Sequence, residues 1–285
     1  MSIYYIDGSF VPADQAVIPV DDLAVLRGFG VFDLVRTYNG KPFFLNEHIE
    51  RLHHSAAEIG LHVPWSHSEL NSIVLDTLAK NNYPESNIRI VVTGGSSPDF
   101  TTPQDKPRLL VLISPLPKLP ETWYADGVKL ITRVTDRFKP GVKSINYIPA
   151  TVALEEARQK GAIEALYLDR EGCVLEGTTS NIFIFKEKIL ITPGRDILSG
   201  ITRKVVLDVA AAHFEVQIRD ISRQELLGAD EVFITGTNKG VVPVVQVDDA
   251  DIGNGRPGPS TLKLTDELAR RTTPDKQTGS GTRGK

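Results

Sequence analysis

Residues 141–185 read GVKSINYIPATVALEEARQKGAIEALYLDREGCVLEGTTSNIFIF, and the rest of the chain is organised around this stretch. Pro149 suits the first turn of a helix, because the N–H that proline lacks would have no partner there. Gly161 can end this helix in a left-handed conformation. Apolar runs then predict strands at 164–168 and 181–185, so the stretch forms one packed unit of a helix and strands.

This unit carries a lysine and a carboxylate on neighbouring elements. Lys143 precedes the helix, and Glu176 lies between the two strands. A lysine becomes a nucleophile when its amine is kept neutral, by desolvation or by a nearby positive charge. Since a lysine before a helix is more often only solvated, the spacing by itself does not decide between the two interpretations.

The composition is that of a soluble globular protein. The chain has 285 residues, of which 41% are hydrophobic and 24% are charged, enough for one large domain or two ordinary ones. A net charge of −4 gives no reason to expect a nucleic-acid partner. No apolar run approaches the ~20 residues that span a bilayer, so no membrane partner is expected. The single cysteine, Cys173, cannot form an internal disulfide, which favours a cytoplasmic protein.

A proline-rich stretch divides the chain into two expected domains. Three prolines in PLPKLP, residues 115–120, favour a stiff and extended connection. We therefore expect a small N-terminal domain at 1–114, a linker at 115–121 and a larger C-terminal domain at 122–271. The tail at 272–285 has nothing to bury and is expected to be disordered.

Local signals predict the elements of the first half. An Asn-Gly hairpin turn leads into an expected strand at 41–45. Asn46 can cap a helix that runs to about residue 59, and Ser66 or Ser68 can cap the next helix. Further strands are expected at 3–6, 31–38, 88–92 and 109–113.

Two glycine-bearing turns are candidate anion sites. Residues 199–202, SGIT, begin an expected helix, where free N–H groups favour a phosphate and Thr202 adds a hydroxyl. Residues 235–238, TGTN, follow an expected strand and offer further amides and hydroxyls. Arg51, on the helix from Asn46, could reach across as a cation. Taken singly, each of these features is more often an ordinary cap, turn or surface arginine.

Arg27 and Arg89 form a second candidate site. Arg27 lies in a glycine-flanked connection, and Arg89 lies in an otherwise apolar strand. An arginine in such a strand must point out of the core or pair with an anion. A guanidinium suits bidentate binding of a carboxylate, although an arginine in solvent on an edge strand would give the same pattern.

Other kinds of site are not supported. The spacings among His48, His53 and His54 do not place metal ligands on one helix face, so these histidines are expected at the surface or partly packed, with no metal bound. GFGVFD at 28–33 lacks the third glycine of a dinucleotide fingerprint, and Gly94-Gly95-Ser96-Ser97 lacks the lysine of a P-loop. No G-x-S-x-G motif is present, so a hydrolase triad is not expected.

Taken together, these features resemble the fold-type IV pyridoxal-phosphate aminotransferases. Six blocks carry the resemblance in one order: GFGVFD at 28–33, FLNEHIERLHHSA at 44–56, KSINY at 143–147, LEGTTSNIF at 175–183, GITR at 200–203 and DEVFITGT at 230–237. The resemblance implies an α/β (α+β) two-domain architecture, with a smaller N-terminal α/β domain and a larger, barrel-like C-terminal α/β domain. It also implies a homodimer with the site at the subunit interface.

The resemblance assigns roles to single residues around pyridoxal 5'-phosphate. Lys143 matches the lysine that holds the cofactor covalently and later moves a proton. Glu176 matches the glutamate that pairs with the pyridine nitrogen, and Tyr147 the tyrosine that hydrogen-bonds the phenolate oxygen. The residues that match the phosphate-binding cup are Arg51, Ile201, Thr202 and Thr237.

Within this family we expect a D-amino-acid transaminase. Tyr147 falls four residues after Lys143, which is the spacing of the D-amino-acid type. D-amino-acid transaminases carry an arginine just after the threonine of a VTRG block, whereas Thr93 here is followed by glycine, so Arg27 and Arg89 are expected to bind the substrate carboxylate instead. The expected reaction is a ping-pong transfer from D-glutamate, D-alanine or a similar donor to 2-oxoglutarate or pyruvate.

Several alternatives stay open. They are a branched-chain L-amino-acid aminotransferase, an (R)-amine transaminase, an aminodeoxychorismate lyase and a non-catalytic protein that binds pyridoxal phosphate. The lyases carry an arginine where Tyr147 stands. An aldolase that uses Lys143 without a cofactor would leave Glu176 and the phosphate cup unexplained.

Overall fold

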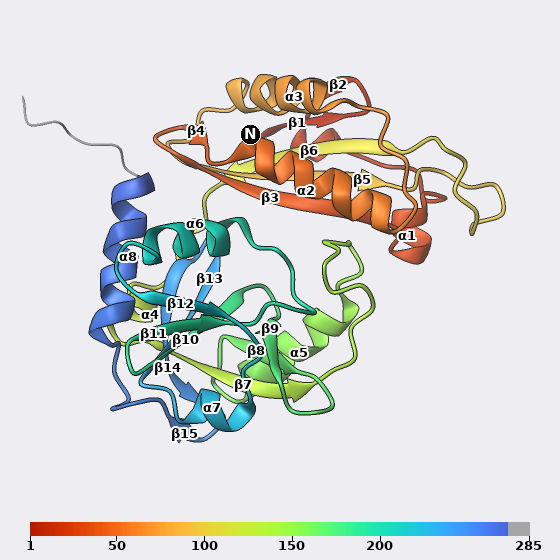
Figure 1. Ribbon diagram of the computed structural model, residues 1–285. Coiled ribbons are helices and arrows are strands. Elements are labelled where there is room, and N and C mark those ends of the chain that lie inside the picture. Colours follow the sequence, from red (N-terminus) through yellow and green to blue (C-terminus); the bar gives the residue numbers. More distant parts are fainter. Residues whose placement is uncertain (273–285) are drawn as a thin grey trace, which may run out of the picture.

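The chain folds into two β-sheets with helices packed against each (Figure 1). The computed structural model describes residues 1–272. The first sheet is antiparallel throughout, with the strand order β2-β1-β6-β5-β3-β4. Its strands are β1 (Ile3–Ile6), β2 (Ser9–Pro12), β3 (Gly30–Tyr38), β4 (Lys41–Pro42), β5 (Ser86–Thr93) and β6 (Arg108–Pro115).

Two helices cover one face of the first sheet, α2 (Leu45–Glu58) and α3 (His67–Ala79). Alternate residues of β3, β5 and β6 point at these helices and form one buried cluster with them. Ser66 caps α3 through a capping box with Glu69, which confirms one of the two predicted caps. The short helices η1 (Ala13–Gln15) and α1 (Leu23–Arg27) lie in the connection from β2 to β3.

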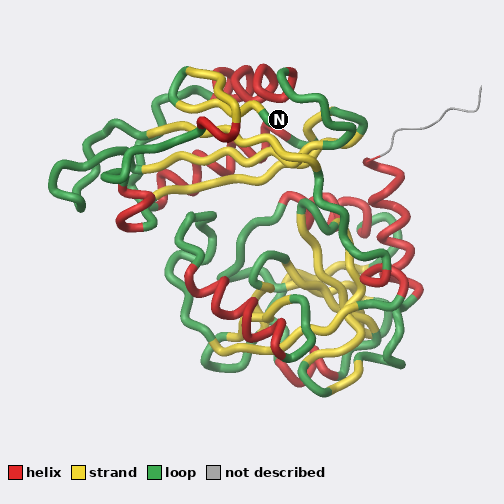
Figure 2. Tube along the Cα trace, turned by 180° about the vertical axis from the view of Figure 1, so that it is seen from behind, coloured by secondary structure: helices red, strands yellow, loops and turns green. Residues whose placement is uncertain are grey.

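The second sheet has nine strands and curls into a half-barrel. The strand order is β12-β11-β10-β13-β14-β7-β8-β9, with β15 paired to β14. The last strand of this order, β9, also contacts the third, β10, because the sheet curls. The strands are β7 (Val128–Val134), β8 (Glu164–Leu168), β9 (Val174–Gly177), β10 (Asn181–Lys186), β11 (Ile189–Thr192), β12 (Glu215–Ile218), β13 (Glu231–Gly236), β14 (Gly240–Val247) and β15 (Ala250–Asp251). Figure 2 shows this sheet and the first sheet as separate layers.

Both faces of the second sheet are buried, as the side-chain alternation of β10 shows. Ile182 and Ile184 join the aliphatic cluster on one face. Phe183 and Phe185 join an aromatic cluster on the other face, which α6 (Ile201–Ala210) and α8 (Pro259–Thr272) cover. Three more helices are α4 (Thr122–Ala125), α5 (Ile148–Gln159) and α7 (Arg223–Leu227). The mixed α/β architecture implied by the family resemblance is therefore confirmed.

The turn before α2 differs from the prediction. Only Lys41–Pro42 is a strand, and α2 begins at Leu45, after Phe44 in a left-handed conformation with φ 53°. Asn46 is therefore inside the helix rather than its cap. The reason is tertiary, because Phe43 and Phe44 turn to pack against the aromatic cluster of the second sheet. These two rings connect the two layers.

The end of the chain also differs. Thr272 is the last residue of α8 rather than the first of a disordered tail. The remaining residues of the predicted tail, 273–285, lie outside the described residues. The predicted domain limits at 114 and 122 stay a prediction.

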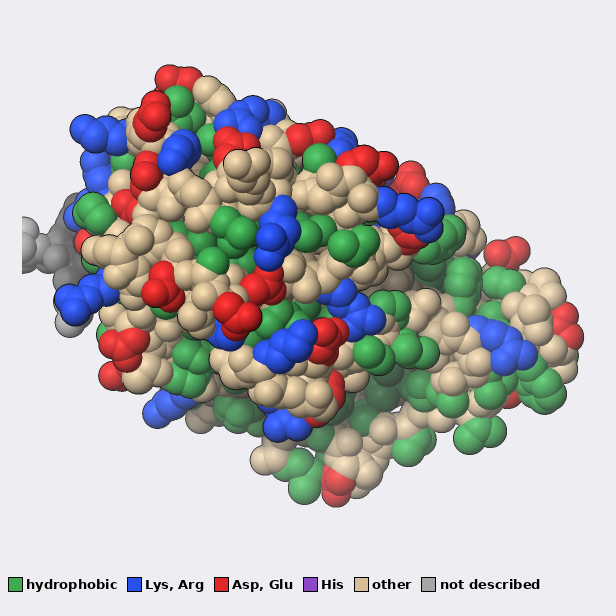
Figure 3. All heavy atoms as spheres, turned by 90° about the horizontal axis from the view of Figure 1, so that it is seen from below, with side chains coloured by type: hydrophobic (Ala, Val, Ile, Leu, Met, Phe, Trp, Pro, Cys, Tyr) green, Lys and Arg blue, Asp and Glu red, His purple; other side chains and the backbone are tan. Residues whose placement is uncertain are grey.

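The surface carries charges of both signs. On the face shown in Figure 3, Lys and Arg side chains lie among Asp and Glu side chains, with hydrophobic side chains between them. Within residues 1–272, no helix combines the length and the apolar character needed to cross a membrane.

The aromatic cluster gives a stability prediction. The rings of Phe183 and Phe233 are both fully buried and stack with their centroids 4.8 Å apart. Replacing Phe183 with alanine leaves a cavity, so we expect the free energy of unfolding to fall by about 3–5 kcal/mol, measured by urea denaturation. In the control, Val17→Ala, the side chain is 77% exposed, and a change within about 0.5 kcal/mol is expected. Equal losses in both variants would contradict this packing argument.

Candidate functional site

Lys143 lies between the two sheets because its backbone pairs with β3. Phe32 donates its backbone N–H to the carbonyl of Lys143 at 3.0 Å, and Ile145 donates its own to the carbonyl of Gly30 at 3.0 Å. The backbone N–H of Lys143 also donates to Ser55 Oγ on α2 at 3.1 Å. The segment at 143–145 therefore acts as a short extra strand on the first sheet, although it leads into α5 of the second layer.

The environment of Lys143 lowers the affinity of its amine for a proton. Burial is the main cause, and the positive charges of Arg51 and Arg89 add to it, while Asp33 and Glu176 oppose it. The pKa of Lys143 falls from 10.5 to about 8. Near neutral pH an appreciable fraction of the amine is then neutral and nucleophilic, as the sequence interpretation required.

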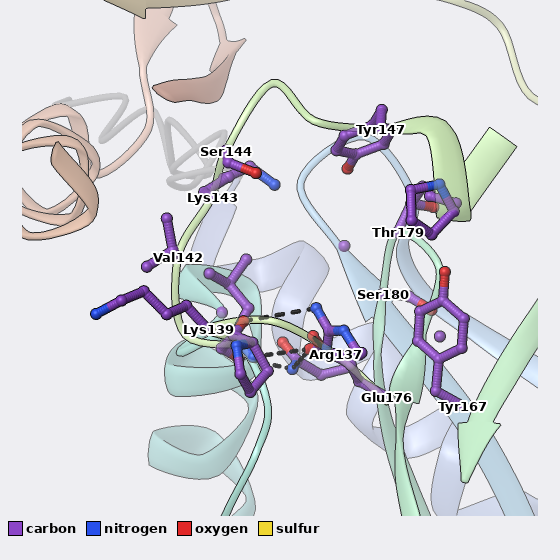
Figure 4. Close-up of a pocket in the computed structure, with 18 of the residues that line it drawn as sticks. Arg137, Lys139, Val142, Lys143, Ser144, Tyr147, Tyr167, Glu176, Thr179 and Ser180 are labelled. Carbon is purple, nitrogen blue, oxygen red and sulfur yellow. Dashed lines mark hydrogen bonds and ion pairs between the residues drawn. The ribbon is translucent and has the colours of Figure 1, made fainter. Parts of the chain in front are cut away.

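Glu176 is a buried carboxylate held by three donors. Its Oε1 pairs with Arg137, and its Oε2 accepts hydrogen bonds from Asn181 Nδ2 and the Leu198 N–H, each at 3.0 Å. Figure 4 shows the contact with Arg137 at the base of the pocket, while Lys139 points away from it. Burial raises the pKa of Glu176, and Arg137 opposes this rise.

Asn181 positions Glu176 only because a glycine stands beside it. A Cβ atom at Gly200 would lie 2.0 Å from Asn181 Oδ1, so any side chain there would displace the amide. Gly200 also precedes α6 without a side-chain cap, which leaves the first N–H groups of α6 open toward the pocket. The glycine of GITR thus serves both the carboxylate site and the anion site.

Arg51 is fixed in the pocket by a buried carboxylate. Its Nε and Nη2 donate to Asp33 at 2.9 and 2.8 Å, and its Nη1 donates to the Ser199 carbonyl at 3.0 Å. Burial raises the pKa of Asp33, but Arg51 and His48 outweigh it and hold this pKa well below its usual range. Arg51 therefore joins α2 of the first layer to the start of α6 in the second.

His48 is part of this network, contrary to expectation. It is 2% exposed, and its Nδ1 lies 2.7 Å from Asp33 Oδ1. Burial lowers the pKa of His48, so the ring is neutral and donates this hydrogen bond. The spacing of three residues between His48 and Arg51 places both on one helix face, and this signal could have indicated a shared partner.

Arg137 is the other residue that sequence reasoning did not single out. It lies in the loop before Lys143, where neither its spacing nor its neighbours form a motif. Its guanidinium also stacks on the Tyr167 ring, with Cζ 5.3 Å from the centroid. Only the folded chain brings it to Glu176.

The polar lining of the pocket fits a phosphorylated cofactor. Among the side chains that the structure describes, Ser180 Oγ and Thr235 Oγ1 are buried without a hydrogen-bond partner, and both residues line the pocket. Buried hydroxyls of this kind call for a ligand that can accept or donate hydrogen bonds. Together with Arg51 and the open start of α6, they suit a phosphate group.

One pocket brings together most of the residues singled out from the sequence. They are Lys143, Tyr147, Glu176, Arg51, Ile201, Thr202 and Thr237. The Tyr147 ring packs edge-on against Phe32, with centroids 5.6 Å apart, and burial raises the pKa of its hydroxyl. This hydroxyl therefore stays protonated and can donate a hydrogen bond.

The two candidate carboxylate arginines lie apart. The Arg89 guanidinium is exposed and stacks over the Phe32 ring, with Cζ 5.0 Å from the centroid, and the Lys143 amine lies 4.7 Å from the same centroid. Arg27 lines a second cavity instead, together with Glu58, Lys139 and other residues between α1 and the loop before Lys143. Arg89 and Lys143 thus lie near one ring, although Arg89 is not among the residues that line the pocket. The cavity of Arg27 adjoins that pocket, because Val142 and Ser144 line both.

Comparisons with known proteins point to one family. The family described as Amino-transferase class IV matches residues 30–247. A "Putative branched-chain-amino-acid aminotransferase" of Methanocaldococcus jannaschii is 38% identical over 274 residues, which cover 93% of this chain and 94% of the relative. A D-alanine aminotransferase of Listeria monocytogenes is 35% identical over 267 residues, which cover 91% of this chain and 92% of the relative.

A solved structure agrees with these relatives. The T.th. branched-chain amino acid aminotransferase, crystallised with pyridoxamine 5'-phosphate, superimposes with a TM-score of 0.89 at 31% identity, covering 95% of this chain and 94% of that one. Pyridoxal 5'-phosphate is the cofactor of this family, and the pocket around Lys143 has the donors to hold it. The chain belongs to the class IV aminotransferases, enzymes that depend on pyridoxal phosphate and transfer an amino group from a donor to a 2-oxo acid.

Proposed function

We propose that the enzyme is a D-amino-acid transaminase. It transfers the amino group of D-glutamate, D-alanine or a similar donor to a 2-oxo acid such as 2-oxoglutarate or pyruvate, in a ping-pong reaction. The preference for a D-amino acid rests on the spacing of four residues between Lys143 and Tyr147, and the position of Arg89 supports a substrate with a carboxylate. The Arg89 guanidinium and the Lys143 amine both lie near the Phe32 ring, and Arg89 forms no ion pair with a carboxylate among residues 1–272.

A free guanidinium beside the reactive amine suits an amino-acid substrate. Arginine binds a carboxylate through two parallel hydrogen bonds, which also fix the orientation of the carboxylate. In this proposal the carboxylate of the donor, and later that of the acceptor, binds Arg89. Arg27, at the second cavity, is a further candidate for the distal carboxylate of a dicarboxylic substrate such as D-glutamate.

The proposed roles of the other residues follow from their chemistry. When bound, pyridoxal phosphate supplies a ring that accepts the electrons released at the substrate α-carbon. Lys143 Nζ removes the α-proton of the donor and delivers a proton to the α-carbon of the acceptor. Glu176, held by Arg137, pairs with the ring nitrogen, and Tyr147 donates to the phenolate oxygen. The proposed phosphate ligands are Arg51, Ile201, Thr202 and Thr237.

A homodimer and a cytoplasmic location belong to the same proposal. Large hydrophobic side chains stand exposed next to the pocket, among them Phe138 and Ile148, at 86% and 74%. A second copy of the chain would cover such an apolar rim. The single cysteine, Cys173, is free, in keeping with a reducing compartment.

A branched-chain L-amino-acid aminotransferase is the second candidate. The relative from Methanocaldococcus jannaschii and the T.th. structure both carry that name. The roles proposed for Lys143, Glu176 and Tyr147 are the same for a D- and an L-amino acid. The preferred donor therefore has to be found by experiment.

The preferred donor is identified first from the absorbance spectrum of the purified enzyme, recorded before and after each amino acid is added. We expect a visible band of the bound cofactor that bleaches when D-alanine or D-glutamate is added and is retained with L-leucine. The donor that supplies an amino group converts the cofactor to its aminated form and removes the band. Bleaching by L-leucine alone would move the enzyme to the branched-chain group.

The role of Arg89 is tested by its alanine variant. Arg89→Ala is expected to raise the KM for D-glutamate by about tenfold or more, because a charge-assisted pair with the carboxylate is lost. Activity toward an (R)-amine without a carboxylate should change little. The control is Arg158→Ala, which removes an exposed guanidinium from α5. Equal losses on the amino acid and the amine would refute the role.

The pKa of Lys143 gives a pH prediction. Only the neutral amine attaches to the cofactor, and its pKa in the folded protein is about 8. The rate of covalent attachment of pyridoxal phosphate to the apoenzyme should therefore rise about tenfold per pH unit below that value and level off above it. Attachment is measured by borohydride reduction and mass spectrometry, with Lys143→Ala as the blank. A rate that keeps rising up to about pH 10, near the ordinary lysine value, would mean that the pKa is not lowered.

A further inference from the structure

A third buried ion pair lies behind the pocket wall and has no part in the roles described so far. Glu164, at the start of β8, is 0% exposed, and its Oε1 pairs with Lys239 Nζ, whose side chain is 17% exposed. Lys239 lies in the turn between β13 and β14. A carboxylate at this depth needs a cationic partner and further hydrogen bonds, because the cost of removing it from water is otherwise not offset.

The pair connects two segments of the pocket wall. Glu164 Oε2 accepts hydrogen bonds from the Thr179 N–H at 2.8 Å and from Thr178 Oγ1 at 3.1 Å. Lys239 Nζ also donates to Thr179 Oγ1 at 2.6 Å. Thr179 therefore contacts both members of the pair, and the loop at 177–180 is joined through them to the turn at 236–239.

The loop has little freedom to adopt another position. A Cβ atom at Gly177 would lie 2.6 Å from Glu164 Oε2 and 2.4 Å from Ser180 Oγ, so the backbone sits directly on the carboxylate. On the turn, the Lys239 carbonyl accepts a hydrogen bond from the Tyr124 hydroxyl at 2.9 Å. Both segments are thus fixed on the side away from the pocket.

Three buried polar atoms in or next to these two segments have no hydrogen-bond partner among the described residues. Ser180 Oγ belongs to the loop, Asn238 Oδ1 belongs to the turn, and Thr235 Oγ1 immediately precedes the turn. Figure 4 shows Thr179 and Ser180 on the pocket wall opposite Lys143. The ion pair therefore lies behind Ser180 and Thr235, which line the pocket and are available to a ligand.

We propose that Lys239 and Glu164 are positioning residues that set the spacing between the loop at 177–180 and the turn at 236–239, and with it the binding of cofactor and substrate. Neither residue contacts the reacting atoms. This inference rests on the proposed site and not on the stereochemistry of the donor. Displacements of even about 1 Å in such a wall weaken binding strongly, because the hydrogen-bond geometry is lost.

The test compares single and double variants. Lys239→Met removes the cation and leaves Glu164 buried without its partner. We expect the Kd of pyridoxal phosphate, from spectrophotometric titration of the apoenzyme, to rise about tenfold, and the KM of the donor to rise similarly, with a smaller change in kcat. Lys239→Arg keeps the charge and should stay close to wild type.

The double variant separates positioning from simple loss of a charge. Glu164→Gln combined with Lys239→Met has no unpaired buried charge and keeps an acceptor for the Thr179 N–H. Its Kd and KM are expected to lie between those of the wild type and those of Lys239→Met. In the control, Lys160→Met, an exposed pair with Glu156 is broken on α5, and neither constant should change.

The outcomes distinguish this inference from the proposed function. KM is measured with whichever donor bleaches the wild-type cofactor band, so an L-specific enzyme would refute the D-amino-acid proposal and leave this test intact. A folded Lys239→Met enzyme with wild-type Kd and KM would overturn the positioning role, as would a double variant weaker than the single one. If Lys239→Met does not fold, Lys239→Gln, which keeps a donor but no charge, is judged by the same thresholds.

Discussion

The backbone pairing between the segment at 143–145 and β3 is the contact on which the site depends. It fixes Lys143 to a strand of the first sheet, while the carboxylate that faces it, Glu176, belongs to the second sheet. The amine is buried because the two layers meet there, and this burial is the main cause of its lowered pKa. A change in the packing of the layers would therefore alter the reactivity of Lys143 as well as its position.

Three buried carboxylates around the pocket each have a cationic partner from another element. Asp33 pairs with Arg51, Glu176 with Arg137 and Glu164 with Lys239. Each pair connects segments that are far apart in the chain, since a buried ion without a partner would destabilise the fold by several kcal/mol. Because an ion pair with good geometry holds both members in one place, the pairs make the pocket wall rigid. A rigid wall is what a site needs if it is to bind a cofactor through many weak contacts.

The residues that hold the buried charges of the pocket do not set the preference for one amino donor over another. Relatives named for D-alanine and for branched-chain amino acids share about a third of their residues with this chain. On the side of the first sheet, the Lys143 amine and the Arg89 guanidinium both lie near the ring of Phe32. Arg89 is exposed, and a substitution at such a position costs little stability.

Features that rest on contacts within a few residues could be predicted from the sequence. The capping box at Ser66, Pro149 in the first turn of α5 and the glycine before α6 all act locally, and the spacing of the motif blocks identified the family together with Lys143 and Glu176. Four features could be seen only in the folded chain: His48 is buried against Asp33, Arg137 holds Glu176, Lys239 reaches Glu164, and Arg27 lines a second cavity. These partners are separated by 15 residues or more in the first three cases, and no local pattern records a contact made by two side chains that meet only when the sheets curl and pack. The same reason explains the start of α2, where packing of Phe43 and Phe44 against the second layer overrode the local signal of Asn46.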